Sequence, residues 1–452
     1  MKEQKTLNQR LNHSITVRLI VIGLLSLLLL IPLYFIQNLI EERANRQTDV
    51  IEEINNQWGK EVLIYGPILQ IPYKTYTLKT ITNKKTNKTY TESIETVNLA
   101  YFFPEELNLN TTINPEEKKR GIYTTAVYHG DINISGTFKM PDFGNIEIKD
   151  KDILWSKAKL ILKSSNIKGV NKIDLRINNN PYNLRSKFNG EKKHYNEITL
   201  HTLETKKINS RDLKFKSEMK FAIQINIKGS QQLQFIPIGK NTSAQVTSNW
   251  KTANFIGSFL PYNKNKVTED GFNAKWKIIA LNRPFSQQHF KALPKLNSFS
   301  FGVNFMIPVD EYQKSERSAK YGLLVISLTF VVFFLIQTLS KINIHPFQYL
   351  MIGLALTMFY TLLVSISEHS DFFKAYVAAS IAVISLITLY SKSILKTLKF
   401  CLFIFSSLTI LYTFIYIIIQ LENYALIVGS IGLFIILAII MFISRRIDWQ
   451  NG

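Results

Sequence analysis

Carboxylate and imidazole side chains stand close together at one point of the sequence, where Glu368 and His369 are followed by Asp371. Imidazole changes its charge near neutral pH, and a neighbouring carboxylate moves that transition, so this group could sense external acidity. The same residues could instead cap the end of an apolar helix, and this interpretation is favoured. Glu368 and His369 are therefore candidate site residues for either role.

A second candidate group is aromatic. Trp250 and Phe255 lie in the segment TSNWKTANFIGSFLP, residues 247–261, where large apolar side chains alternate with small and polar ones. Such a segment could line a ligand groove, but a strand and turn that pack on a core would show the same pattern. Packing is the favoured interpretation, and Trp250 and Phe255 are kept as candidate ligand-binding residues.

Residues with known catalytic or metal-binding spacing are missing. The sequence contains no G-x-x-x-x-G-K-[ST], G-x-S-x-G or H-E-x-x-H motif and one cysteine, Cys401. His194 and His201 could in principle share a metal, although two exposed polar histidines are the simpler interpretation. His129, beside a glycine in YHGD, is expected in a turn. We therefore predict no metal, no cofactor and no catalytic residues. Whether the protein is an enzyme stays open, with a non-enzymatic role favoured.

Long apolar stretches at both ends of the chain must position these residues. Residues 18–40 contain 22 uncharged residues between Arg18 and Glu41, and a membrane span needs about 20. A cleaved signal peptide would have a shorter apolar core and a small-residue cleavage site, so an uncleaved anchor is favoured. Five further spans are predicted, forming one compact bundle within 322–443. They are 322–339, 347–367, 372–390, 400–419 and 424–443.

Basic residues predict the orientation of these spans. Lys and Arg beside span ends are retained in the cytoplasm. With six spans, four basic groups fall on one side: the leader 1–17, the hinge with Lys341, the hinge with Lys392, Lys396 and Lys399, and the tail 444–452. The two alternating hinges contain no Lys or Arg. We therefore expect both termini in the cytoplasm and residues 41–321 outside it, in the periplasm of a bacterial envelope.

The segment 41–321 has the pattern of a mainly-β domain. In 219–227, apolar residues alternate with polar ones, as in a strand with one buried face. Turns are expected at 178–181 and at Lys228-Gly229-Ser230. An antiparallel sandwich or a pair of packed β lobes fits best. Helix-compatible charge spacings at both ends, such as Glu316 with Lys320, predict short helical stalks that continue the spans.

The positive charge of the chain favours some partners and disfavours others. The net charge is +21, and the segment 41–321 holds 43 Lys and Arg against 28 Asp and Glu. A cationic domain beside a membrane could bind envelope polyanions or a periplasmic or inner-membrane protein. A Lys- and Asn-rich composition without functional meaning is the favoured alternative. Nucleic acid is not expected as a partner, because the charge lies across a membrane from the cytoplasm.

Nine segments taken in order resemble the CreD family, inner-membrane proteins of cell-envelope integrity in Gram-negative bacteria. They include EERANRQTDVIEEI (41–54), GPILQIP (66–72), RGIYTTAVYHGDI (120–132), EDGFNAKW (269–276) and RRIDW (445–449). The Lys- and Asn-rich stretch 145–245 departs from the pattern. The resemblance implies a multi-pass protein of the cell inner membrane with a periplasmic domain and a link to envelope stress. It implies no catalytic residues.

Two functions of different classes follow from these patterns. The leading hypothesis is a scaffold or binding protein of envelope maintenance, whose periplasmic β domain contacts an envelope component. The alternative is a membrane-embedded carrier or enzyme that acts on a lipid-linked envelope precursor. A carrier needs a polar cavity among its spans, whereas a scaffold can pack its helices tightly through small residues.

Overall fold

The computed structural model describes residues 15–82, 89–187, 198–213, 218–305, 311–340, 342–421, 424–445 and 447. The chain divides into two compact units. The helical unit comprises Met1–Asp49 and Val309–Gly452, and the β unit comprises Val50–Pro308. The predicted fold class is confirmed: an N-terminal apolar helix precedes a mainly-β middle domain, which is followed by five apolar helices.

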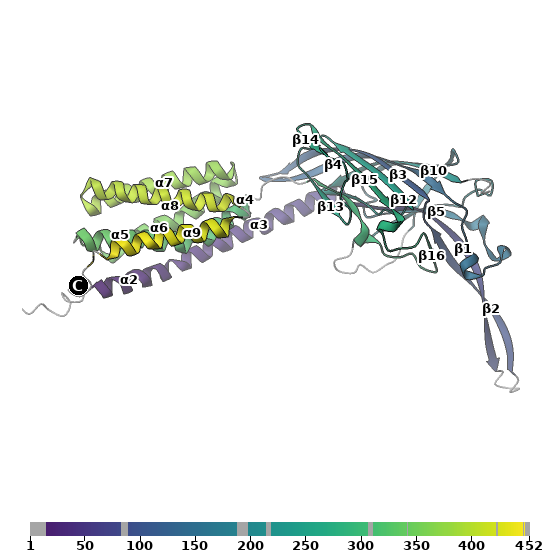
Figure 1. Cartoon of the computed structure of the whole chain (residues 1–452), viewed down its shortest axis with the longest axis horizontal. Coiled ribbons are helices and arrows are strands. Elements are labelled where there is room, and N and C mark those ends of the chain that lie inside the picture. Colours follow the sequence, from purple (N-terminus) through teal and green to yellow (C-terminus); the bar gives the residue numbers. More distant parts are fainter. Residues whose placement is uncertain are drawn as a thin grey trace, which may run out of the picture. The chain divides into compact units, whose positions relative to one another are not determined.

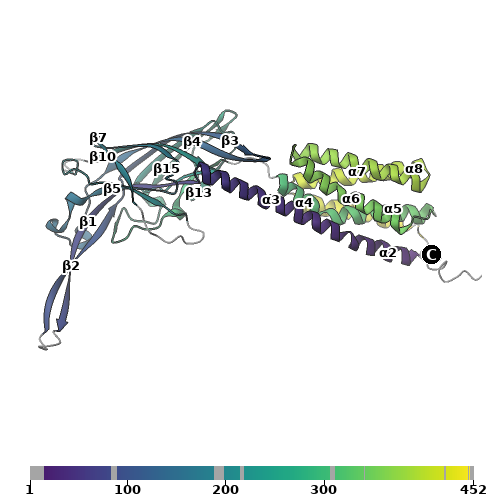
Figure 2. The same ribbon diagram turned by 180° about the vertical axis from the view of Figure 1, so that it is seen from behind.

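Six helical stretches in the described part of the chain are long and apolar enough to cross a membrane. Figures 1 and 2 show α5 to α9 lying side by side in one bundle. The first stretch runs from Ile15 to Trp58 and is divided into two helices. The helices are α2 (Ile15–Leu28), α3 (Leu30–Trp58), α5 (Gly322–Ser340), α6 (Pro346–Ser367), α7 (Phe372–Leu395), α8 (Leu398–Gln420) and α9 (Ala425–Ser444).

The division between α2 and α3 falls at Leu29, one turn before Pro32. Proline has no backbone N–H, so Pro32 cannot donate the helical hydrogen bond to the carbonyl of Leu28. Hydrogen bonds on either side persist: Leu29 N donates to Leu25 O at 3.0 Å, and Leu33 N donates to Leu29 O at 3.3 Å. The interruption is therefore local, and the helix continues beyond it.

A short amphipathic helix, α4 (Glu311–Lys320), precedes α5 and packs against α5, α6, α7 and α8. Its residues Tyr312, Ser315 and Ala319 recur at intervals of three and four and are buried. This spacing places them on one face of a helix. Helix α4 therefore belongs to the helical unit, and the small side chains of Ser315 and Ala319 let it lie close to the bundle.

The β unit contains two mixed sheets. The nine-stranded sheet has the order β13-β17-β11-β1-β5-β9-β8, with β2 beside β1 and β16 beside β2. Its strands are β1 (Val62–Thr82), β2 (Thr89–Phe102), β5 (Lys159–Ser164), β8 (Leu184–Lys187), β9 (His201–Thr205), β11 (Gln232–Phe235), β13 (Ala253–Gly257), β16 (Gln288–Phe290) and β17 (Phe301–Phe305).

The eight-stranded sheet has the order β14-β15-β12-β3-β4-β10-β6-β7. Pairing is not antiparallel throughout, because β12 runs parallel to β3, and in the other sheet β1 runs parallel to β11. The strands are β3 (Glu106–Arg120), β4 (Tyr123–Phe138), β6 (Val170–Ile177), β7 (Asn180–Tyr182), β10 (Met219–Ser230), β12 (Asn241–Ser248), β14 (Val267–Thr268) and β15 (Gly271–Ile279).

One hydrophobic cluster unites the two sheets of the β unit. The alternation predicted in β10 is present, since Phe221, Ile223 and Ile225 are buried while Ala222 and Gln224 are exposed. Trp276 of β15 is among the largest fully buried side chains and packs against Phe255 and Phe301. The alternation leaves the outer face of the eight-stranded sheet to polar side chains.

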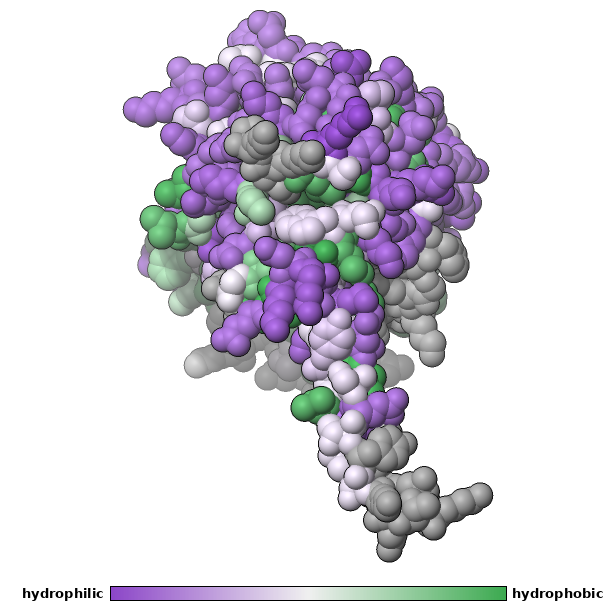
Figure 3. Space-filling view, turned by 90° about the vertical axis from the view of Figure 1, so that its right-hand side faces the viewer, coloured by the Kyte–Doolittle hydropathy of each residue, from purple (hydrophilic) through white to green (hydrophobic). Residues whose placement is uncertain are grey.

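The outer half of β1 and β2 forms a two-stranded ribbon that stands away from the rest of the β unit (Figures 1 and 2). Both strands are exposed there, and Leu78 and Ile94 are among the exposed large apolar side chains. Figure 3 shows the ribbon below a visible face of the β unit that is covered mostly by hydrophilic residues. The surface of the β unit is therefore largely polar in this view.

Two local predictions in the β unit are wrong. The turn expected at Lys228-Gly229-Ser230 is absent, because β10 continues to Ser230 and the chain turns at Gln231, with φ at 59°. A Cβ on Gly229 would lie 2.3 Å from the Tyr128 hydroxyl oxygen, so the glycine serves a close approach between strands. His129 is also not in a turn but lies within β4, opposite Lys228.

Candidate functional site

Glu368 directly follows the last residue of α6 and is held by two other helices of the helical unit. The Tyr312 hydroxyl of α4 donates a hydrogen bond to its carboxylate at 3.2 Å, and Arg43 Nε of α3 lies 3.7 Å from the same oxygen. The Glu368 side chain is 15% exposed. A carboxylate at a helix C-terminus is disfavoured by the helix dipole, and the Arg43 guanidinium offsets this. The cluster therefore joins α3, α4 and α6.

The other polar residues after α6 do not join this cluster. His369 is exposed, and its backbone N–H donates to Ile366 O at 3.1 Å. Asp371 pairs instead with Lys374, at 2.7 Å, with both side chains largely exposed. The structure thus separates the predicted titrating group into one inter-helical contact, one exposed imidazole and one surface ion pair.

Trp250 and Phe255 both pack against the hydrophobic core of the β unit. The Phe255 ring meets the edges of Phe272 and Trp276, with ring centroids 5.8 and 6.0 Å apart. Lys266 Nζ lies 5.8 Å from the centre of the same ring. Both aromatic residues are partly buried. This arrangement matches the packing interpretation of the segment more closely than a ligand groove.

Arg283 is a buried cation that the sequence did not reveal. It is 5% exposed and donates hydrogen bonds to the carbonyls of Phe285, Ile238 and Gly239 at 2.9 to 3.3 Å, and also to Gln287. Burial lowers the pKa of its guanidinium to about 10. Several carbonyl acceptors compensate a buried guanidinium, which has five N–H donors. Arg283 therefore fastens the loop before β12 to the segment before β16.

Metal coordination has little support in the described part of the chain. No group of three or more His, Cys, Asp or Glu residues is positioned there to hold a metal ion. His201 is exposed at the first residue of β9. His194 lies outside the described residues.

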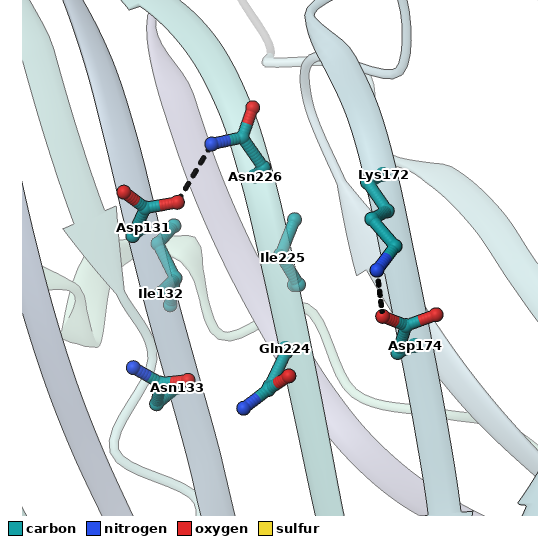
Figure 4. Close-up of a pocket in the computed structure, with 8 residues that line it drawn as sticks. All are labelled: Asp131, Ile132, Asn133, Lys172, Asp174, Gln224, Ile225 and Asn226. Carbon is teal, nitrogen blue, oxygen red and sulfur yellow. Dashed lines mark hydrogen bonds and ion pairs between the residues drawn. The ribbon is translucent and has the colours of Figure 1, made fainter.

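The outer face of the eight-stranded sheet carries a polar hollow of about 450 Å³. Six polar side chains stand on three neighbouring strands around it, and Figure 4 shows them on one side of the sheet. Asn226 donates to Asp131 at 2.6 Å, and Lys172 pairs with Asp174 at 2.7 Å. The lining polar residues are Asp131 and Asn133 of β4, Gln224 and Asn226 of β10, and Lys172 and Asp174 of β6.

This hollow offers hydrogen bonding rather than an activated group. Amide side chains provide two donors and an acceptor each, and the charged residues around the hollow are already bonded to neighbours. The arrangement suits the binding of a polar ligand. Sequence reasoning missed it, because the six residues come from three strands between positions 131 and 226.

Similarity to known proteins extends over nearly the whole chain. A family model described as inner membrane protein CreD matches residues 14–450. The chain belongs to the CreD family. It is 30% identical over 437 residues to the inner membrane protein CreD of Escherichia coli (strain K12), covering 94% of this chain and 91% of that relative. The resemblance inferred from the sequence is confirmed, and the chain is an inner membrane protein that embeds in the lipid bilayer.

The core of the bundle in this CreD-family chain is aromatic. The Phe359 ring of α6 packs against Tyr360, Tyr376 and Tyr412, with centroids 4.6 to 5.2 Å apart. The Tyr376 hydroxyl donates to the carbonyl of Tyr412 at 2.8 Å. Buried hydroxyls in a membrane need such partners, because neither water nor lipid tails supply them there. Aromatic edges and a hydrogen bond thus hold α6, α7 and α8 together.

Two grooves lie on the bundle of this CreD-family protein. One, of about 730 Å³, is lined mostly by aliphatic and phenylalanine side chains of α5, α8 and α9, a surface that lipid chains can cover. The other, of about 430 Å³, lies between α7 and α8, and its lining residues include Tyr376, Ser380, Thr409 and Tyr412. In the described residues, Ser380 Oγ and the Tyr412 hydroxyl are buried without a hydrogen-bond partner. The second groove therefore borders two buried hydroxyls whose hydrogen-bonding capacity is unused, but which are not themselves exposed to it.

Proposed function

We propose that this CreD-family protein is a non-enzymatic scaffold or binding protein of envelope maintenance. The helical unit anchors the β unit at the periplasmic side of the inner membrane, with both termini in the cytoplasm. The β unit then contacts an envelope component, such as a polyanion or another envelope protein. This is the role that the polar outer face of the eight-stranded sheet supports best.

The distribution of Lys and Arg supports the orientation. The basic hinge residues Lys392, Lys396 and Lys399 lie between α7 and α8 or at the ends of these helices. Glu368 and Asp371, between α6 and α7, are acidic. Basic residues near span ends favour the cytoplasmic side, while acidic residues have little influence. Six spans with this alternation return both termini to the cytoplasm.

The single observation that carries the binding role is the polar hollow of Figure 4. It lies on a sheet whose opposite face is buried, so its side chains are held at fixed spacings by strand pairing. Polar groups on a paired strand scaffold favour specific recognition, because the backbone that carries them is already ordered and loses little further freedom on binding. Its amides and its engaged charges are groups that bind a ligand without changing it.

Cysteine accessibility tests the orientation. In a Cys401→Ala background, Leu281→Cys places a thiol at a residue of the β unit that is 92% exposed. Ser393→Cys places one at an exposed position near the end of α7 and changes no charge. A membrane-impermeant maleimide added to intact spheroplasts should label Leu281→Cys and leave Ser393→Cys unlabelled until the membrane is lysed. The reverse pattern would refute the proposal.

One observation favours the second candidate, a carrier for a lipid-linked precursor: beside the groove between α7 and α8, the buried hydroxyls of Ser380 and Tyr412 have no hydrogen-bond partner in the described residues. Tyr412→Phe removes one of these hydroxyls while keeping the ring. Loss of an unsatisfied buried hydroxyl should stabilise the bundle by about 1 kcal/mol or more. A carrier that uses this hydroxyl would be stabilised and lose its envelope function together, as in stability–activity trade-offs. A scaffold would be stabilised in the same way and would keep its envelope function.

A further inference from the structure

The hollow of Figure 4 is one part of a wider polar surface on the eight-stranded sheet. Strand pairing aligns residues of β12, β3, β4 and β10 in three rungs across the outer face. We call these twelve residues the amide face. They are Ser243-Asn108-Ser135-Ala222, Gln245-Asn110-Asn133-Gln224 and Thr247-Thr112-Asp131-Asn226.

The amide face is nearly free of charge in a strongly basic chain. Ten of its twelve side chains are amides or hydroxyls, and Asp131 is its one ionised group. Charged residues flank it on both sides: Lys275 and Lys277 of β15 pair with β12, and Lys172, Asp174 and Arg176 of β6 pair with β10. Lysine-rich composition therefore does not explain this surface, since the lysines stop at its edges.

Much of the hydrogen-bonding capacity of this face is unused. Residues at the edges of the face are engaged: Asn226 bonds to Asp131 and Asn171, Gln245 bonds to Asn273 at 3.1 Å, and Thr247 bonds to Thr112 and to the carbonyl of Thr111. For Asn110, Asn133 and Gln224, the structure records no side-chain hydrogen bond among the described residues, and all three are exposed. These three lie next to one another in the middle rung. Each presents donors and an acceptor together, which is also the capability of a sugar hydroxyl or acetamido group.

The spacing of residues along one rung suits an extended polymer. Neighbouring strands lie about 4.8 Å apart, so the middle rung repeats an amide at an interval close to the length of one sugar residue. Extended by Lys275 of β15 and Asp174 of β6, this rung crosses six strands, a span of about 24 Å. A glycan strand along the rung would meet several successive side chains, whereas a single small molecule would meet one or two.

A basic cluster lies at one end of the amide face. The next rung is Asn114-His129-Lys228. The Trp58 ring packs edge-on against His129, with Lys228 Nζ 5.2 Å and Lys118 Nζ 4.9 Å from its centre. One aromatic ring thus gathers two ammonium groups and concentrates positive charge at this site. That site would attract a carboxylate or phosphate carried by a ligand on the neighbouring rungs.

We propose that the amide face binds a polysaccharide strand that carries acidic substituents. The sugar hydroxyls and acetamido groups bond to the middle rung, and an acidic group meets Lys118 and Lys228. A protein partner fits the surface less well, because interface centres are enriched in aromatic residues, Met and Arg. Nucleic acid would require basic residues along the whole path. This inference deepens the proposed function, on which it rests, by naming the class of envelope component.

The test uses the purified full-length protein in nanodiscs, so it does not depend on the orientation of the protein in cells. Three probes are used: protease-treated peptidoglycan sacculi and lipopolysaccharide, both acidic, and chitin, which is neutral. The wild-type protein should bind at least one acidic glycan more tightly than chitin, and added salt should weaken that preference. The sacculi and lipopolysaccharide arms distinguish the two sources of acidic sugar.

Valine substitution tests the middle rung. Asn110→Val/Asn133→Val/Gln224→Val removes three amides while favouring strands, since β-branched residues suit them. Binding should fall about tenfold to hundredfold, as expected for a few neutral hydrogen bonds. The matched control, Thr77→Val/Thr91→Val/Ser93→Val, changes exposed strand residues of the β1–β2 ribbon and should bind like wild type. Lys118→Gln/Lys228→Gln should abolish the preference for acidic glycans over chitin.

Three results would overturn the inference: no binding to any of the three glycans, equal binding by wild type and the middle-rung variant, or equal loss in the ribbon control. Binding only to sacculi that have not been treated with protease would assign the face to a protein partner and also overturn it. Hydrogen exchange in β3 and β4 shows whether each variant is folded. Failure here leaves the cysteine-labelling result unaffected, so the two proposals are tested separately.

Discussion

The two units of this chain place their polar side chains in opposite ways. In the β unit, apolar residues fill the space between the sheets, and amides and hydroxyls cover the outer face. In the helical unit, large apolar residues such as Leu389 and Phe434 are exposed, while Gln337 and Tyr349 are buried and bonded to each other at 2.8 Å. The difference follows from the solvent, because water drives apolar groups inward and lipid does not. Cavities of similar size should therefore reduce the stability of the two units by different amounts.

The largest expected effect tests this difference in the β unit. Trp276→Ala removes a side chain that is 2% exposed and whose Nε1 donates to Phe259 O at 3.0 Å. The loss of burial plus the cavity should reduce the stability of the β unit by about 3–5 kcal/mol. Hydrogen exchange of β12 and β15 in the full-length protein measures it. Protection equal to that of wild type would show that the sheet core collapses around the gap.

Phe359→Ala is the matched change in the helical unit. Phe359 is 1% exposed and touches three tyrosine rings. Its removal loses packing, but moving a phenylalanine into lipid has little of the transfer penalty that water imposes. The destabilisation should therefore be smaller than for Trp276→Ala, as measured by exchange in α6 and α8. An equal or larger effect would contradict the solvent argument.

The sequence predicted the parts of the fold that depend on local patterns. Apolar runs of membrane-spanning length and the period-2 alternation of β10 predicted the fold class. Each such pattern lies within one segment and indicates both its secondary structure and whether lipid or water surrounds it. Tertiary partners could not be predicted in this way. Glu368 meets Arg43 from the other end of the chain, and the parallel pairing of β12 with β3 joins residues far apart in sequence. Gly229 and His129 resembled turn residues because glycine marks both turns and close approaches.

The amide face escaped prediction for the same reason. Asn110, Asn133 and Gln224 each occupy an outward position in a different strand, and each alone is an ordinary exposed polar residue. They form a candidate binding surface only because the strand register places them side by side in one rung. The candidate residues chosen from the sequence were neighbours along the chain, whereas the polar groups gathered by the fold are neighbours across strands.

The second largest expected effect concerns the buried cation of the β unit. Arg283→Met keeps much of the side-chain volume and leaves the carbonyls of Ile238, Gly239 and Phe285 without this donor. The carbonyl of Ile238 keeps a long hydrogen bond from Gln287 and that of Gly239 keeps one from Thr242, so the main cost comes from Phe285 O and from Gln287, which lose this donor. An unsatisfied buried carbonyl costs about 1–3 kcal/mol, so a loss of about that size is expected. Faster exchange or proteolysis near residues 238–241 and 283–287 measures it. Arg283→Lys replaces only part of the set of donors, so its stability should lie between that of Arg283→Met and that of the wild type.

A smaller effect is expected at the cluster that joins α3, α4 and α6. Glu368→Gln removes the charge facing Arg43 while keeping an acceptor for Tyr312. Because the Glu368 side chain is largely buried and Arg43 is half exposed, the loss should be about 0.5–1.5 kcal/mol, seen as faster exchange in α4. Asp371→Asn, which breaks the exposed pair with Lys374, is the control and should leave α4 unchanged. If both variants speed exchange in α4 equally, the Glu368 cluster does not stabilise α4 more than the exposed Asp371–Lys374 pair does.

The smallest effect is a pH dependence in the β unit at His289. Burial lowers the pKa of His289, and Arg283 nearby lowers it further, although the ring contact with Ser286 O opposes this. The unfolded chain therefore binds a proton more readily than the folded one. The stability contributed by neutral His289 is complete above its ordinary pKa of about 6.5 and is lost as the pH falls toward the lower, folded value.

His289→Gln should make the stability of the β unit less dependent on pH between about 7 and 5, with little change at pH 7.5. Thermal unfolding of the full-length protein over this range measures the slope. His201→Gln changes an exposed histidine of the other end of the nine-stranded sheet and should leave the slope as in wild type. If the slope survives His289→Gln, other groups carry the acid sensitivity of the β unit, and its polar surface rather than this half-buried ring would set the response to pH.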